Sequence, residues 1–211
     1  MENTTQRLVK TAILLAIATG LSIIKIFELP FGGSVTAASM MPVIIIAYMY
    51  GTKWGLLSGA VYGVLQMLTG MNIVAAMFLP GESQMLVWQA ILVCLIDYIL
   101  AYMMLGFGGI FKGKIKNNIM AVALGTVIAM LLSYIMHIIS GYIFYGEWAE
   151  WFFTQEGFYS FGTKIVENFD GKILSLLYSI VYNGLYMIPE IIITVIVTPI
   201  VYKFLLKSKV I

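Results

Sequence analysis

Residues 117–145 read NNIMAVALGTVIAMLLSYIMHIISGYIFY, a run that contains no Asp, Glu, Lys or Arg. A helix of about 20 apolar residues is long enough to cross a bilayer, so this run predicts a transmembrane helix. Comparable apolar runs cover residues 8–28, 35–50, 54–71, 86–110 and 174–205. Arg7 and Lys10 resemble the start of a signal peptide, but the first run is too long for one. The sequence therefore predicts an all-α integral membrane protein, with six transmembrane helices forming a single domain over residues 1–211.

The composition agrees with a membrane protein. Of the 211 residues, 61% are apolar and 10% are charged, and the mean hydropathy is +0.97. Soluble domains carry about 25% charged residues, so these values exclude a soluble globular domain and a disordered chain. A net charge of +2 is too small for a nucleic-acid binder. The chain has one cysteine, Cys94, so a disulfide within the chain is excluded. Cys94 lies in an apolar run.

The charged residues predict the orientation. With six spans, both termini and the loops after the second and fourth spans share one side. That side carries nine of the twelve basic residues, namely Arg7, Lys10, Lys53, Lys112, Lys114, Lys116, Lys203, Lys207 and Lys209. Because basic residues favour the cytoplasmic side, we expect both termini in the cytoplasm. The acidic segment 146–173, rich in Trp and Phe, then lies outside as an interfacial aromatic belt, a lid over an outward-facing site, or both.

Two stripes of small residues predict close helix packing. The third run carries Gly51, Gly55, Gly59 and Gly63 at intervals of four residues. Such spacing lets helix backbones approach each other, and we expect these glycines to pack inside the fold. The first run carries Ala12, Ala16 and Gly20 at the same spacing. This face could pack inside the fold or dock a partner protein, and spacing alone does not decide between them.

Polar side chains inside the spans point to a site. Asp97, His137 and Asn183 all lie roughly 12–17 Å below the outer surface, counted at 1.5 Å per helical residue. Each could simply hold helices together, but ionisable groups at this depth are usually paired or functional. Glu190 lies about 26 Å from the outer surface by the same count, so we expect a structural or partner-contact role for it.

Aromatic residues accompany these polar groups. His137, Gly141 and Tyr145 share one helix face, Tyr98 follows Asp97, and Tyr178 precedes Asn183 by five residues. A carboxylate together with ring faces suits a small, flat, nitrogen-rich ligand that carries positive charge.

Enzymatic readings find little support in the sequence. The chain has one His and one Cys, which gives no cluster for a metal site. It contains neither a Gly-x-Ser-x-Gly motif nor a phosphate-binding loop, so it cannot hydrolyse ATP by itself. We therefore expect a membrane protein that binds a small aromatic cation rather than an enzyme, with no cofactor and no ATPase of its own. An autonomous secondary transporter, proton-coupled through Asp97 or Glu190, remains open at this point.

Four stretches in this order resemble the thiamine-binding S components of energy-coupling factor (ECF) transporters. They are Gly32-Gly-Ser-Val-Thr36 leading to Met41-Pro42, Asp97-Tyr-Ile-Leu-Ala101, His137-Ile-Ile-Ser-Gly-Tyr-Ile-Phe-Tyr-Gly146 and Tyr178-Ser-Ile-Val-Tyr-Asn-Gly-Leu-Tyr-Met-Ile-Pro189. The resemblance implies a substrate-capture subunit of the bacterial cell membrane. It would bind extracellular thiamine and work with a transmembrane coupling subunit and two cytoplasmic ATPases.

The resemblance also implies roles for single residues. Asp97 takes the acidic position against the charged thiamine, with Tyr98 beside it. His137, Tyr178 and Asn183 match polar ligand contacts. Tyr145 matches a stacking aromatic, and Gly141 lies within the same motif. Ala12 and Ala16 resemble the family's docking signature for the coupling subunit. An S component for another vitamin or for a thiamine precursor is the alternative.

Overall fold

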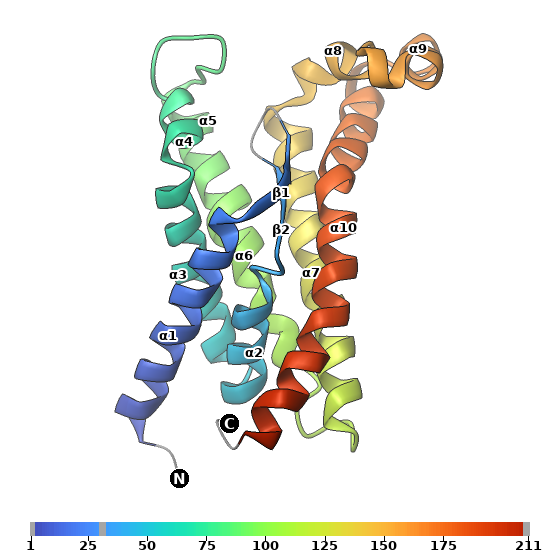
Figure 1. Ribbon diagram of the computed structural model, residues 1–211. Helices are drawn as coiled ribbons and strands as arrows, with labels where there is room; N and C mark the ends of the chain where they lie inside the picture. Colours follow the sequence, from blue (N-terminus) through green and yellow to red (C-terminus); the bar gives the residue numbers. More distant parts are fainter. Residues whose placement is uncertain (1–2, 30–32, 209–211) are drawn as a thin grey trace.

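The computed structural model describes residues 3–29 and 33–208 as a bundle of helices with one small β-hairpin. Segments running along the bundle are α1 (Thr4–Ile23), α2 (Met41–Tyr50), α3 (Thr52–Thr69), a composite fourth segment, α7 (Asn118–Phe144) and α10 (Gly171–Lys207). The fourth segment changes its winding along its length: α5 (Val87–Val93), the π-helical η1 (Cys94–Leu100), α6 (Ala101–Met103) and the 3₁₀-helical η2 (Met104–Gly109). A short helix, α4 (Met71–Ala76), follows α3. Figure 1 shows the start of α1 and the end of α10 at the same end of the bundle.

Several of these segments have the length and composition of membrane spans. In the described part of the chain, four are long and apolar enough: α1, the fourth segment over Val87–Gly109, α7 and α10. The apolar α2 is only ten residues long, and the glycine-rich α3 is not among the four. The chain is therefore a multi-pass membrane protein, while a count of six spans stays a prediction.

Local capping explains where two of the helices begin. The Asn3 side chain accepts from the Gln6 amide at 2.8 Å, and the Gln6 side chain accepts from the Asn3 amide at 3.1 Å. Asn117 accepts from the amides of Ile119 and Met120 in the same manner. These bonds satisfy amides that have no partner within a first helical turn. Position 117 was also the predicted start of the fifth span.

A β-hairpin replaces the end of the first predicted span. The prediction of one helix over 8–28 is wrong beyond Ile23, because β1 (Lys25–Glu28) pairs antiparallel with β2 (Ser34–Thr36). The helix of the second span starts at Met41 rather than at residue 35. Ile26 and Phe27 belong to the residue types that favour strands, which explains the change of structure within one apolar run. Gly32 of the quoted motif lies outside the described residues.

The outer segment 146–173 folds into short helices. They are η3 (Gly146–Trp148), α8 (Ala149–Phe153), η4 (Glu156–Phe158) and α9 (Tyr159–Asn168). Figure 1 shows α8 and α9 across the end of the bundle opposite the termini. Phe152 and Phe153 are buried, whereas Trp151 and Phe161 are exposed. The aromatic residues of this segment therefore divide between the core and the surface, and an interfacial belt accounts only for the exposed ones.

The four glycines at the start of the third run were predicted to pack inside the fold, and the prediction is confirmed for three of them. A Cβ on Gly59 would lie 2.3 Å from the carbonyl oxygen of Tyr102, and one on Gly63 would lie 2.6 Å from that of Tyr98. Gly55 is equally close to Ala47 and Gly106. Gly51 has another role, because its φ of 89° lets the chain turn between α2 and α3.

The small-residue stripe of α1 does not pack inside the fold. Ala12, Ala16 and Gly20 are all exposed, and nothing lies within 4 Å of a Cβ built on Gly20. Of the two alternatives that the sequence left open, internal packing is therefore wrong. In the described chain this face lies on the outside of the bundle.

The contrast between Gly59 and Gly20 gives a test of the packing. Gly59→Ala should lower the free energy of unfolding by about 1–3 kcal/mol, since the new methyl group meets backbone atoms that cannot move aside. Gly20→Ala adds the same methyl group to an exposed helix position with open space, and there it should be neutral or stabilising by up to about 1 kcal/mol. Thermal unfolding of both variants in detergent measures the difference. Equal melting temperatures for the two would contradict the close approach of α3.

Candidate functional site

A cavity lies between β2, α3, the fourth segment, α7 and α10. It holds about 830 Å³ of space free of protein atoms, part of it open to solvent. Its wall is made of polar and aromatic residues: Gly33, Ser34, Thr36, Ser39, Met40, Gln66, Asp97, Tyr98, Tyr102, His137, Gly141, Tyr145, Tyr178, Tyr182, Asn183, Tyr186 and Glu190.

All seven residues singled out from the sequence line this one cavity. They come from η1 (Asp97 and Tyr98), from α7 and the residue after it (His137, Gly141 and Tyr145), and from α10 (Tyr178 and Asn183). The argument from equal depth therefore predicted a real proximity. That these residues contact a ligand stays a prediction.

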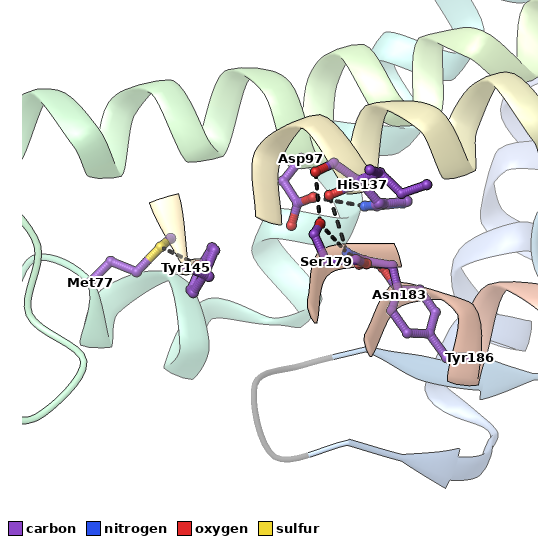
Figure 2. A network of polar contacts seen from close by, with 8 residues as sticks. Met77, Asp97, His137, Tyr145, Ser179, Asn183 and Tyr186 are labelled. Atoms are coloured by element: carbon purple, nitrogen blue, oxygen red, sulfur yellow. Dashed lines mark hydrogen bonds and ion pairs between the residues drawn. The ribbon is translucent and has the colours of Figure 1, made fainter. Parts of the chain in front are cut away.

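Asp97 and His137 form the central polar contact (Figure 2). Nδ1 of His137 lies 2.8 Å from Oδ1 of Asp97, and the side chains are 6% and 28% exposed, respectively. An ionised Asp97 can only accept, so Nδ1 of His137 then carries the proton. Asp97 is the more open member, and its second oxygen makes no hydrogen bond to His137. The pair thus holds the carboxylate in place while leaving it able to meet a ligand.

Asn183 ties α10 to α7 through the same histidine. Its Nδ2 donates to the carbonyl oxygen of His137 at 3.2 Å and to that of Ser179 at 2.9 Å. Its Oδ1 accepts from the hydroxyl of Tyr186 at 2.8 Å. Figure 2 shows these side chains gathered around His137. The interpretation of Asn183 as a link between helices is confirmed, and its place in the cavity wall leaves a ligand contact open.

Gly141 provides the space for this network. A Cβ at this position would lie 2.3 Å from Oγ of Ser179 and 3.0 Å from Nδ2 of Asn183. Ser179 in turn donates to the carbonyl oxygen of Ile138 at 2.7 Å. A side chain at position 141 would displace the side chains of Ser179 and Asn183 and so disturb this network.

Aromatic rings enclose the imidazole and the rest of the cavity. The rings of Tyr102 and Tyr186 meet that of His137 edge to face, at centroid distances of 6.1 and 5.8 Å. Tyr178 packs on Tyr182 at 5.5 Å, and both contact Phe152 of α8. The hydroxyl of Tyr145 reaches Sδ of Met77 at 3.5 Å (Figure 2). Such rings offer flat, electron-rich faces to a ligand.

The sequence analysis missed several wall residues. Tyr182, Tyr186 and Glu190 follow Tyr178 at intervals of four along α10, so helical periodicity could have found them. Tyr102 stands four positions after Tyr98 in the fourth segment. The hairpin and the turn after it contribute Gly33, Ser34, Thr36, Ser39 and Met40. The resemblance drew attention to residues 32–36, but neither hydropathy nor periodicity indicated that this stretch enters the bundle.

Glu190 differs from its expected setting. It is fully buried, so the expected contact with a partner is wrong. Its Oε1 accepts from the amide and from the hydroxyl of Thr36, each at 2.5 Å. The expected structural role is therefore confirmed, but at the cavity wall rather than near the far end of the bundle.

The described residues of the cavity wall carry acidic groups but no basic side chain of the Lys or Arg type. The acidic groups are the carboxyl groups of Asp97 and Glu190. Within the described ranges, no three His, Cys, Asp or Glu side chains come close enough together to hold a metal ion. The arrangement suits a flat organic cation, which would gain from both the carboxylate and the rings.

Comparisons with known proteins show which family the chain belongs to. A family model described as thiamine transporter protein matches residues 8–165. The thiamine transporter ThiT of Bacillus subtilis (strain 168) is 30% identical over 202 residues, which cover 90% of this chain and 87% of that protein. A solved structure of ThiT from Listeria monocytogenes matches with a TM-score of 0.62 and 26% identity, over 96% of this chain and 93% of that one. The fold expected from the resemblance is thus confirmed, as is a transport protein rather than an enzyme. The chain belongs to the thiamine transporter family.

Proposed function

We propose that this chain is the substrate-capture component of an ECF-type importer and that it binds thiamine in the cavity around Asp97. In this proposal residues 1–211 form one six-helix domain of the bacterial cell membrane, with both termini in the cytoplasm. Thiamine enters from outside, and a transmembrane coupling subunit with two cytoplasmic ATPases drives its release to the inside.

The observation that carries the proposal is the setting of Asp97. Its carboxylate lies in an aromatic wall without a described Lys or Arg and is held from one side by His137. Thiamine is a cation made of two flat rings, one of which carries an amino group. In a partly dry cavity a carboxylate attracts such a cation far more strongly than it does in water.

The rings and the amide complete the recognition. Tyr145 and Tyr178 offer faces on which the thiamine rings can stack. Tyr98, next to Asp97, lines the same wall. The Asn183 amide donates to the backbone carbonyl oxygen of His137, and the His137 ring is held by Asp97, so both side chains would meet the ligand in a fixed position. Preorganised contacts of this kind cost little conformational entropy on binding.

The exposed face of α1 is the proposed docking surface. Ala12 and Ala16 leave a shallow strip on the outside of the bundle, and the neighbouring Ile13 and Ile17 are about half exposed. Small residues let a second helix approach closely within a membrane. Since the sequence contains no phosphate-binding loop, energy for release would have to come through this contact.

Replacement of the carboxylate tests the binding site. Asp97→Asn should weaken thiamine binding roughly 10- to 100-fold, the value of a hydrogen bond to a charged group, without unfolding the chain. Quenching of tryptophan fluorescence by thiamine, measured on the purified chain after removal of bound ligand, gives the affinity.

Asp170→Asn is the matched control, because Asp170 is an exposed carboxylate just before α10. It should bind thiamine as the unmodified chain does. Unchanged affinity in Asp97→Asn would remove Asp97 from the site. A response to riboflavin or to the pyrimidine half of thiamine, with none to thiamine itself, would favour an S component for another ligand.

Enlargement of the α1 strip tests docking separately from binding. Ala12→Leu together with Ala16→Leu should leave thiamine affinity unchanged, since both side chains point away from the cavity wall. Uptake by cells that contain the coupling subunit and the ATPases should fall at least about tenfold, because the larger side chains prevent close helix approach. Ile135→Phe on the exposed side of α7 is the control and should transport normally.

Transport that persists in the double variant would contradict docking at this strip. Uptake that needs no ATPase and stops when the proton gradient is dissipated would select the secondary transporter instead.

A further inference from the structure

The hairpin β1–β2 forms one wall of the cavity but has little structure of its own. Gly33, Ser34 and Thr36 line the cavity, whereas all four residues of β1 are exposed. A two-stranded sheet alone is marginally stable in water. The position of this wall therefore depends on how the second strand is attached to the helices.

Glu190 provides a polar attachment at the end of β2. One oxygen of its carboxyl group accepts two hydrogen bonds from Thr36, one from the amide and one from the hydroxyl, each at 2.5 Å. Both residues are buried, at 0% and 4% exposure. Loss of a buried acceptor leaves its donors without a partner, which costs more than the hydrogen bond contributes.

The same attachment organises the turn that follows β2. The Thr36 hydroxyl lies 2.8 Å from that of Ser39 and accepts from the Ser39 amide at 3.2 Å. Because the Thr36 hydroxyl proton goes to Glu190, the Ser39 hydroxyl donates to Thr36. Ser39 and Met40 both line the cavity. Glu190 thus fixes wall residues on either side of Thr36.

The helix face that carries Glu190 also carries the aromatic wall. Tyr182 and Tyr186 precede Glu190 at intervals of four residues, and all three line the cavity. Above the anchor, Gly33 lies so close to Tyr186 that a Cβ would come within 2.3 Å of the ring. The hairpin therefore meets α10 at two points of the cavity wall, Gly33 against Tyr186 and Thr36 against Glu190.

We infer that Glu190 is a positioning residue for ligand binding: it holds β2 against α10 and so keeps the hairpin wall of the cavity in its binding position. It does so through Thr36 and needs no contact with the ligand. This role builds on the proposed thiamine site. It adds a residue outside the group around Asp97 that controls how long a ligand stays bound.

The test compares variants on both sides of the contact. Glu190→Ala removes the acceptor of both hydrogen bonds and Thr36→Val removes only the hydroxyl donor, whereas Glu190→Gln keeps an accepting oxygen and Thr36→Ser keeps the hydroxyl. We expect the thiamine dissociation rate constant to rise roughly 10- to 100-fold in Glu190→Ala. Thr36→Val should show a smaller rise, because its amide still reaches Glu190, and the two conservative variants should stay near the original value.

Two further readouts separate positioning from general support of the fold. The double variant Glu190→Ala/Thr36→Val should release thiamine no faster than Glu190→Ala, because both changes break one contact. Hydrogen exchange of the ligand-free chain in Glu190→Ala should speed up in residues 25–40 and stay unchanged in α7. Additive rate effects, or faster exchange throughout the bundle, would overturn the inference.

The exchange measurement also keeps the two proposals distinguishable. If the chain does not bind thiamine at all, the kinetic comparison fails together with the proposed function. The exchange comparison needs no ligand, and unchanged exchange in residues 25–40 of Glu190→Ala would overturn the anchor alone.

Discussion

A carboxylate inside an apolar bundle needs a donor, and His137 supplies it to Asp97 at 2.8 Å. The same histidine accepts at its carbonyl oxygen from Asn183, and its ring contacts Tyr102 and Tyr186 edge to face. One residue therefore joins the fourth segment, α7 and α10. Polar groups inside a bilayer must find partners within the protein or in a water-filled cavity, so these contacts favour the arrangement of the three segments that the structure shows. The cavity exists because that arrangement is enforced around a group that remains partly open.

Glycines, which have no side chain, matter for the cavity as much as the polar residues do. Gly59 and Gly63 let α3 approach the carbonyl oxygens of Tyr102 and Tyr98, which fixes the wall that carries Asp97. Gly141 does the same between α7 and α10. Close packing at these points leaves the remaining volume at the cavity rather than spread through the bundle. Stability and binding therefore draw on the same few contacts, and a substitution that widens the packing would also deform the site.

The sequence predicted the long helices well and the irregular parts poorly. The fifth span was placed at 117–145 and α7 covers Asn118–Phe144, because an uninterrupted apolar run and a capping Asn117 define it. Asp97, His137 and Asn183 were brought together correctly, since depth along straight helices can be counted. The hairpin could not be foreseen, because Lys25–Glu28 continues an apolar run and its partner strand is only three residues long. For the same reason the sequence did not place Glu190 at the cavity wall: its structural role was expected, but its partner Thr36 belongs to the unforeseen strand.

Cys94–Leu100 is wound as a π-helix, so the number of residues in this segment affects how the helix is oriented on either side of Asp97. A π-helix has more residues per turn than an α-helix, and such a stretch within a helix often marks a functional site. Each residue of an α-helix rotates the chain by about 100°. Deleting a single residue here would let the segment relax to α-helical winding and would swing Val87–Val93 round relative to Asp97. The shape of the pocket therefore depends on the number of residues in this stretch as well as on the aspartate, and an insertion or deletion here would reorient its wall even if every lining residue were kept.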